Sequence, residues 1–288
     1  MWRVNRESLT ALAGSRALMM ELAHPLVAAA VARHSNFRRD PLGRLYRTLR
    51  AANDLTFGDA AAARRAAHQI HRCHLRVEGM LSNGVGPLAE GTYYCANDPH
   101  LKLWVLATLI DSTLRVYNVF IRSLSPDETE GYYRDCQVLG RLLGIDASIV
   151  PATFQEFDLY MNSMLGSDLL TVGDAAREMI RALFAPPLLG GLARVVSFAG
   201  IGLLPERVRE GYGFPWSERQ QKLLERLARI SRRLRPLIPS VFCVNPRALL
   251  AEHGLRAPFP LASLKAADAL RITPFTARAL RRRYTRRN

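Results

Sequence analysis

Apolar residues recur along most of the chain with the three- to four-residue spacing of amphipathic helices. Alternating runs of β-branched residues, which are typical of half-buried strands, are scarce. The pattern predicts helices over residues 7–23, 25–33, 41–55, 59–80, 173–185, 217–235 and 274–287. It therefore predicts an all-α fold, and one large domain is expected because no Ser/Gly-rich linker interrupts the chain.

Four further helix starts are marked by residues that cap the exposed amides of a first turn. They are Asp98-Pro99, Ser125-Pro126, Thr153 with Glu156, and Asn245-Pro246. Long helices are predicted after the first three. Residues 98–120 are apolar on nearly every face, so this segment is expected to be a central, buried helix.

The most apolar stretch, residues 183–204, does not read as a membrane span. Pro186, Pro187, Gly190 and Gly191 interrupt it, and these residues break a spanning helix. A buried or surface-lying segment is the prediction here.

The 288 residues are 49% hydrophobic and 23% charged, a balance that suits a large core around a cofactor. The net charge is +15, and only three of the 40 basic residues are lysines. Arginine binds carboxylates and phosphates in bidentate fashion, so haem propionates, acidic lipids and nucleic acid all remain candidate partners.

Six of the arginines lie between Arg278 and Arg287. A solvated tail is the favoured interpretation, and contact with an anionic membrane is the alternative. Nucleic-acid binding is disfavoured, because no stacking aromatic other than Tyr284 accompanies these charges.

The four cysteines, at positions 73, 95, 136 and 243, show neither C-x-x-C spacing nor the density of a secreted disulfide scaffold. A reducing compartment is therefore expected. Charges at Arg3, Arg6 and Glu7 interrupt the apolar core that a signal peptide would need. The predicted location is the cytoplasm, with membrane contact through the tail as an addition.

Three histidines lie close together, and helix geometry separates them. Ile70, His74, Val77 and Leu81 return to one helix face, so His74 is predicted to point into the core. Two roles for His74 fit this position, a hydrogen-bonded core residue and a metal ligand. A joint metal site in H-x-x-H-x-x-H is disfavoured, because the three side chains spread over about 120° of a helix.

Arg44 and Thr48 follow the helix start at Asp40-Pro41 and stand one turn apart on one face. They are suited to holding an anionic group or bound dioxygen, and an ordinary surface pair is the alternative. Arg47 points elsewhere on an ideal helix.

Asp111 is the only acid in the middle of the apolar helix 98–120. Burial of a carboxylate requires a partner, so we expect an arginine, a histidine or a cap beside it. Structural bracing and the orienting of a ligand histidine are the two hypotheses for its role.

Phosphate loops, dinucleotide-binding turns, zinc-protease helices and nucleophile elbows are absent from the sequence. The commonest nucleotide and hydrolase chemistries therefore lose their usual support. A cofactor that is held by a single protein ligand needs no short motif.

Four blocks in order resemble the domain shared by the MpaB oxygenases and rubber oxygenase. They are ALMMELAHPLVAAAVARHSNFRRDPLGRLYRT, then Phe57-Gly58, then HLRVEG from His74 to Gly79, then YYCANDPHLKLWVLATLIDS. The resemblance spans about residues 2–236. It implies an all-helical, globin-like fold that encloses haem b, with oxidative chemistry driven by dioxygen.

The resemblance also implies roles for individual residues. A histidine in the HLRVEG block is the axial ligand of the iron, which carries over to His74. The family's R-x-x-x-T motif maps onto Arg44 and Thr48 near the haem, and its basic residue before the threonine maps onto Arg47. Leu106 stands where relatives commonly have a pocket histidine, and no counterpart of the glutamate proposed as base in rubber cleavage is found.

Together these readings predict a haem-binding oxygenase domain over residues 1–240 and a helical extension with a basic tail over 241–288. The predicted enzyme uses haem b, through iron on His74, to oxidise a small apolar substrate with dioxygen or peroxide. Arg44, Thr48 and Asp111 are the other predicted haem-site residues. The alternative is a non-catalytic haem or lipid carrier whose basic tail docks to a membrane or partner.

Overall fold

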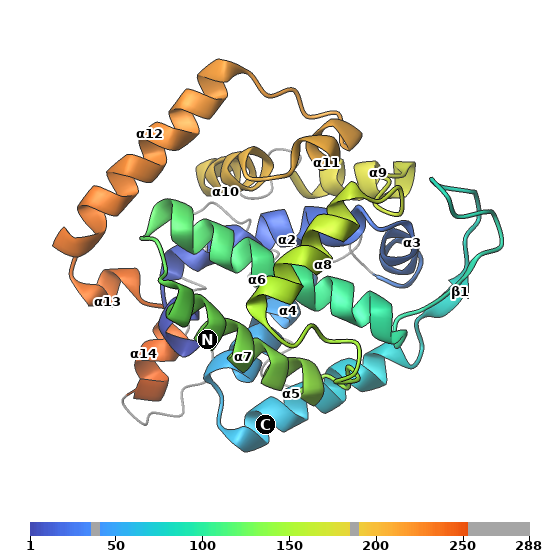
Figure 1. The fold of residues 1–288 in the computed structure, drawn as a ribbon, viewed down its shortest axis with the longest axis horizontal. Helices are drawn as coiled ribbons and strands as arrows, with labels where there is room; N and C mark the ends of the chain where they lie inside the picture. The colour runs from blue at the N-terminus through green and yellow to red at the C-terminus, as the bar shows by residue number, and fades with distance from the viewer. Residues whose placement is uncertain (36–40, 185–189, 253–288) are drawn as a thin grey trace, which may run out of the picture.

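The computed structural model describes residues 1–35, 41–184 and 190–252 and confirms an all-α fold in one domain (Figure 1). Its elements up to the first two strands are α1 (Trp2–Asn5), the 3-10 helix η1 (Ser8–Leu12), α2 (Ala13–Leu22), α3 (Pro25–His34), α4 (Pro41–Phe57), α5 (Ala60–His74), β1 (Glu78–Met80) and β2 (Tyr93–Cys95). The rest are α6 (Pro99–Phe120), α7 (Pro126–Leu142), α8 (Phe154–Gly166), α9 (Asp174–Phe184), α10 (Gly190–Gly202), α11 (Glu206–Gly211), α12 (Glu218–Leu234), η2 (Arg235–Leu237), α13 (Ser240–Cys243) and α14 (Pro246–Glu252).

The predicted caps begin the helices as expected. The Asp98 carboxylate accepts hydrogen bonds from the amides of His100 and Leu101, at 2.8 and 3.1 Å. Ser125 forms a reciprocal capping box with Glu128, and the Thr153 hydroxyl accepts from the Glu156 amide. Long helices follow all three, so these local signals were sufficient to place them.

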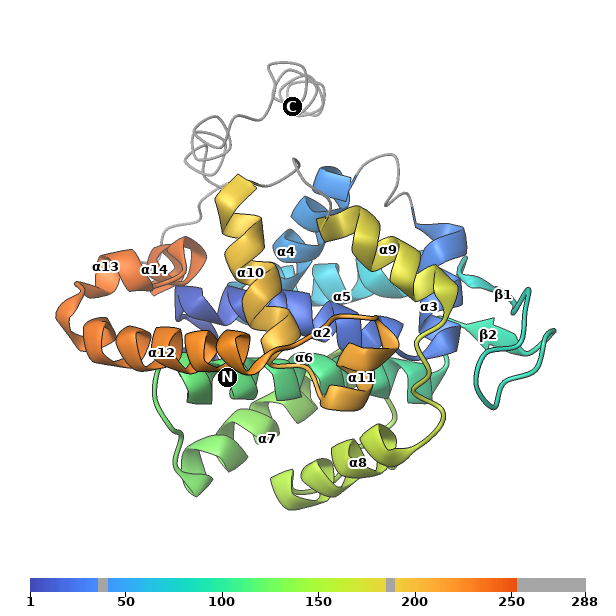
Figure 2. The same cartoon turned by 90° about the horizontal axis from the view of Figure 1, so that it is seen from above.

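Helix α6 runs through the middle of the molecule, with α2 packed along it (Figures 1 and 2). Trp104 and Ala107 of α6 lie in one core cluster with Met19 and Met20 of α2, and all four side chains are buried. The prediction of a central, buried helix over residues 98–120 is confirmed.

The predicted helix 59–80 is wrong beyond His74. Helix α5 ends there, and residues 78–80 form a short antiparallel ribbon with residues 93–95, in which Gly79 pairs with Tyr94. A Cβ on Gly79 would come 2.7 Å from the Tyr94 hydroxyl oxygen, so glycine permits this close approach. The chain therefore leaves the helix before Val77 and Leu81, which are not on its inward face.

The single helix predicted over residues 7–23 is two elements in the structure, η1 and α2. The predicted helix 274–287 lies outside the described residues, as do the arginines of the tail. Within the ranges that the structure describes, no helix is long and apolar enough to cross a membrane.

The last described helix, α14, packs against the start of the chain. Val244 and Ala248 are buried in a small cluster with Phe57, and Trp2 packs against it. The Asn245 amide donates to the Arg6 carbonyl, and Arg247 is paired with Asp54. The domain boundary at residue 240 stays a prediction, although residues 244–252 are in contact with the main body.

Candidate functional site

Helix α5 presents His74 from its last turn. The helix begins at Ala60 because the Asp59 carboxylate accepts the Ala62 amide at 2.7 Å. Its buried side chains are Ala66 and Ala67, and positions one and two turns further on bring Ile70 and His74 to the same face. The prediction that His74 points inward is therefore confirmed, although alanines rather than the later aliphatic residues define this face.

The His74 imidazole is partly buried, and its Nδ1 atom has no hydrogen-bond partner among the described residues. A buried polar atom without a partner costs free energy, so such an atom calls for an explanation in function. Burial lowers the pKa of His74, and the positive charges of Lys102 and His71 lower it further. The imidazole is therefore neutral at neutral pH, which is the form that binds metal.

Lys102 of α6 is close enough for its charge to lower the pKa of His74, and no role was predicted for it from the sequence. Its ammonium donates to the carbonyls of Leu143 and Gly144 just after α7, at 3.4 and 3.5 Å, and burial lowers its pKa. The signal that was overlooked is composition, because lysine is rare in this chain and this one lies on an apolar helix. His74 and Lys102 thus mark the place where α5, α6 and the end of α7 meet.

A hollow of about 240 Å³ opens next to this junction. Its walls are four residues of α5 and three at the end of α7, namely Arg64, Ala67, His68, His71, Leu142, Leu143 and Gly144. Helix α5 packs chiefly on α4 and touches the remaining helices sparsely, so space is left between it and α7. His68 and His71 are exposed on this hollow, whereas His74 faces inward.

Helix α4, the packing partner of α5, carries the predicted R-x-x-x-T pair. Arg44 and Thr48 lie one turn apart on it, but the Arg44 side chain is outside the described residues. Thr48 and Arg47 are exposed. The structure therefore brings the helix of the pair against the helix of His74, and the roles of these three residues stay predictions.

Asp111 has the partner that its burial required. Its carboxylate accepts a hydrogen bond from Arg16 at 2.5 Å, and Arg16 also donates to the Ser112 hydroxyl and the Leu203 carbonyl. Arg16 is buried, whereas Asp111 keeps 28% of its side chain exposed. Asp111 lies nine residues beyond Lys102, about 13 Å along the axis of α6. Within the described part of the chain this arrangement favours bracing over an orienting contact with His74.

His24 is also buried, and the sequence did not lead us to predict it as a buried or functional residue. Its Nδ1 accepts the Leu26 amide at 3.3 Å and so caps α3, and burial lowers the pKa of His24 to about 4 although the nearby Asp98 charge acts in the opposite direction. The available signal was its position directly before Pro25, at which a helix starts. Because Asp98 caps α6, His24 lies near the same end of α6 as Lys102.

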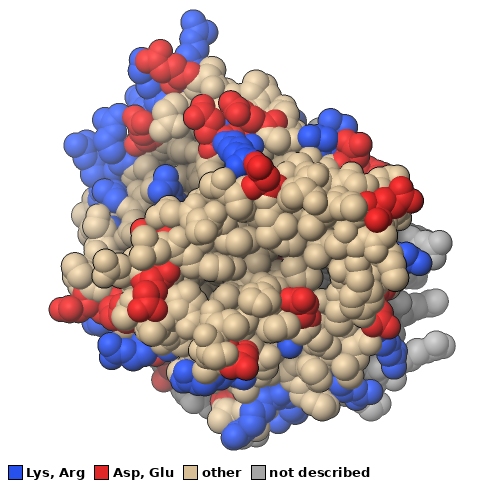
Figure 3. Space-filling model, turned by 45° about the vertical axis from the view of Figure 1, so that its right-hand side comes forward, with Lys and Arg blue, Asp and Glu red and all other residues tan. Residues whose placement is uncertain are grey.

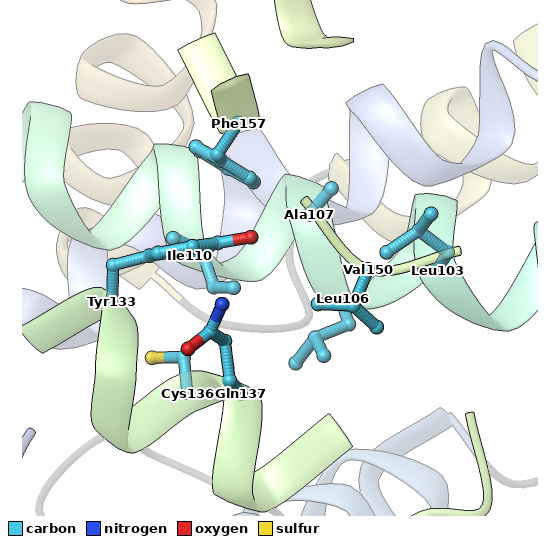
Figure 4. A pocket seen from close by; sticks show the side chains of 9 residues that line it. All are labelled: Leu103, Leu106, Ala107, Ile110, Tyr133, Cys136, Gln137, Val150 and Phe157. Atoms are coloured by element: carbon cyan, nitrogen blue, oxygen red, sulfur yellow. The ribbon is translucent and has the colours of Figure 1, made fainter. Parts of the chain in front are cut away.

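A second cavity lies between α6, α7 and α8 and is lined mostly by apolar side chains, together with Tyr133 and Gln137, which carry polar atoms (Figure 4). Leu106, Tyr133, Cys136 and Phe157 are among its walls, and its volume of about 10 Å³ is that of one water position. Leu106 stands one turn after Lys102 on α6. It fills space on the side of α6 that faces the end of α7, next to Gly140.

The sequence profile described as "ER-bound oxygenase mpaB/B'/Rubber oxygenase, catalytic domain" matches residues 2–233. The chain belongs to this oxygenase family. Two uncharacterised proteins, one of Mycobacterium bovis and one of Mycobacterium tuberculosis, are 29% identical to it over 189 residues, which cover 64% of this chain and 69% of each relative. No solved structure matches the chain.

Because the sequence resembles haem-binding members of the MpaB/rubber oxygenase family, the residues near His74 can be compared with what a haem requires. The donor chemistry fits, because His74 offers a neutral imidazole with one unpaired, buried ring nitrogen. The hollow beside it is slightly smaller than the roughly 300 Å³ at which small-molecule pockets begin. Neither of the two cavities described above is a large enclosed pocket, so the expected haem pocket stays a prediction.

Proposed function

We propose that this protein is a haem b-dependent oxygenase that oxidises a small apolar molecule with dioxygen or peroxide, with the iron bound by His74. The observation that carries the proposal is the unpaired Nδ1 of a neutral, inward-facing His74 in a chain of an oxygenase family. Haem bound there would activate the dioxygen or peroxide that oxidises the substrate.

In this proposal the protein's own residues bind, orient and exclude water. The Arg64 guanidinium lines the hollow, on the same helix as His74, and supplies positive charge for carboxylates such as haem propionates. Arg44 and Thr48 donate hydrogen bonds to the oxidant, and Arg47 adds positive charge from a neighbouring face of the same helix. Burial keeps the His74 ring deprotonated, so protons do not compete for the ligand nitrogen at neutral pH.

In this proposal Asp111 has a structural role. Its pairing with Arg16 fixes α6 against α2, and α6 in turn carries Lys102 and Leu106. The four cysteines are free thiols, which supports a reducing compartment such as the cytoplasm. Contact of the basic C-terminal tail with a membrane stays a proposal, because the tail lies outside the described residues.

The test of the cofactor is optical. The purified protein, or the apoprotein after hemin titration, is expected to show a Soret band that His74→Ala loses or shifts. His100→Ala, at an exposed histidine of α6 that does not line the hollow, is the matched control and should keep the band. A protein that stays colourless and does not bind added hemin would remove the proposal, and an unchanged band in His74→Ala would remove His74 from the role.

Turnover separates an enzyme from a carrier. Oxygen or peroxide consumption is measured with a panel of lipophilic substrates, and Arg44→Ala and Thr48→Ala are expected to retain haem but to lower turnover about 100-fold. The rival function, a non-catalytic haem or lipid carrier, is favoured by Leu106, which occupies the position of a family pocket histidine. Haem binding without any consumption would support that rival.

A further inference from the structure

Helix α12 carries a stripe of apolar side chains on its outer surface. Leu223, Leu227, Ile230 and Leu234 follow one another at steps of four, three and four residues, so they share one face of the helix. They are 47%, 39%, 44% and 47% exposed. A helix that only covered the core would present polar residues here, so the stripe needs a partner or a function.

The stripe is not the face by which α12 packs on the protein. Leu224 and Ala228 are buried against Val116 and Phe120 of α6, and the Ser231 hydroxyl donates to the Phe120 carbonyl at 2.7 Å. These positions lie about 100° around the helix from the exposed stripe. Helix α12 is therefore anchored by one face and leaves a second apolar face to solvent, at the edge of the molecule (Figures 1 and 2).

Basic side chains border the stripe along its solvent side. Arg219, Arg226 and Arg233 recur every seven residues next to it, and all three are exposed. Glu218 and Glu225 lie on the far side of the helix, where Glu218 pairs with Lys222. Residues 218–235 hold seven basic and two acidic residues. At the upper left of Figure 3, the side on which α12 lies, Lys and Arg are prominent and some Asp and Glu lie among them.

More exposed apolar side chains follow in the chain directly after α12. Leu237 and Phe242 are 77% and 76% exposed, and Ile238 is 40% exposed. An apolar face flanked by arginines and followed by an exposed aromatic residue has the composition of helices that lie in the interface of a membrane.

We propose that α12 and the segment after it form a docking surface for an anionic lipid membrane. The apolar stripe enters the boundary between headgroups and acyl chains, and Arg219, Arg226 and Arg233 contact anionic headgroups. The net charge of the candidate partners favours a membrane over a second copy of the protein or the C-terminal tail. A second copy would bring the same basic face against this one, and residues 253–288 carry nine basic residues and one acidic residue, so both would be repelled.

Vesicle flotation tests the surface with the full chain. The protein is expected to bind phosphatidylcholine vesicles that contain about one third phosphatidylglycerol, to bind pure phosphatidylcholine much more weakly, and to lose binding as salt is raised. Leu227→Ser with Ile230→Ser, and separately Arg226→Gln with Arg233→Gln, should each lower partitioning at least about 10-fold. All four positions are exposed, so thermal unfolding should remain close to that of wild type.

Matched controls carry the same changes elsewhere. Val138→Ser with Leu159→Ser removes exposed apolar side chains from α7 and α8, and Arg134→Gln with Arg141→Gln removes exposed charge from α7. Both should bind like wild type. A third control, Arg281→Gln with Arg282→Gln and Arg283→Gln, removes charge from the tail and should leave most of the binding.

The proposal is overturned if wild type does not float with anionic vesicles, if the α12 variants float like wild type, or if only the tail variant loses binding. It is also overturned if the α12 variants convert a dimer into a monomer in light scattering, because the stripe would then be a subunit interface. The Soret band of each α12 variant is recorded in parallel. Loss of vesicle binding with normal haem content separates this proposal from the proposed function.

Discussion

The histidines show which site features can be predicted one residue at a time. The inward orientation of His74 was predicted from helical periodicity, which is local information, although of the residues used only Ile70 shares α5 with it. The burial of His24 and the approach of Lys102 depend on α3, α5 and α6 meeting in three dimensions. Spacing along the sequence does not contain that information, so these two residues were missed.

His24 makes a prediction about pH. Its pKa falls from 6.5 to about 4 on folding, so the folded state favours the neutral ring. Its contribution to stability is complete above pH 6.5 and is lost as the pH falls from 6.5 toward 4, where the unfolded chain binds the proton more readily. A shift of this size corresponds to about 3 kcal/mol.

His24→Asn keeps a side chain that can cap α3 but does not titrate. Urea unfolding is compared at pH 7 and pH 4.5, and the variant is expected to lose less stability than wild type between these two values. The exposed His100→Asn is the matched control. If His24→Asn and wild type lost the same stability between the two pH values, burial of a neutral His24 would be the wrong explanation.

Asp111 tests bracing against a role at the haem. Asp111→Ala leaves the Arg16 guanidinium buried without its charge partner, and the free energy of unfolding is expected to fall by about 3 kcal/mol. The folded fraction should bind hemin with an unchanged Soret band, because the carboxylate acts on α2 and not on His74. A shifted band in well-folded protein would favour the orienting hypothesis instead.

At the scale of the element, local chemistry decided what was predictable. The helices that begin at Asp98, Ser125 and Thr153 were placed correctly because their caps act within one turn. The end of α5 was placed incorrectly, because the residues after His74 leave the helix and residues 78–80 pair with residues 93–95. Pairing across that distance has no signal in the helical periodicity.

Two glycines in helices are expected to respond to alanine with opposite signs. Gly131, inside α7, has no atom within 4 Å of the place of a Cβ, so Gly131→Ala should raise the free energy of unfolding by up to about 1 kcal/mol. At Gly202 a Cβ would come 2.5 Å from the Trp216 ring, so Gly202→Ala should cost about 2 kcal/mol. Denaturant midpoints measure both, and equal shifts would show that packing around Gly202 does not resist the methyl group.

At the scale of the whole molecule, the ends of the described chain hold each other. Arg235 forms two hydrogen bonds with the Glu7 carboxylate, both at 2.7 Å, and Arg6 pairs with Glu252. Val244 and Ala248 cover Phe57. The family profile ends at residue 233, and the C-terminal partner in each of these contacts lies beyond that residue. The described residues beyond position 233 thus pack against the start of the chain, and we expect them to stabilise the family domain.

Two truncated chains, ending at Glu252 and at Leu234, test this. Both lack residues 253–288, so their difference isolates residues 235–252. The shorter chain is expected to unfold at lower denaturant, by about 3 kcal/mol, because it exposes Phe57 and leaves Glu7 without its arginine. Equal stability would mean that the family domain closes its own core, and the extension predicted from residue 241 would then be a separate unit.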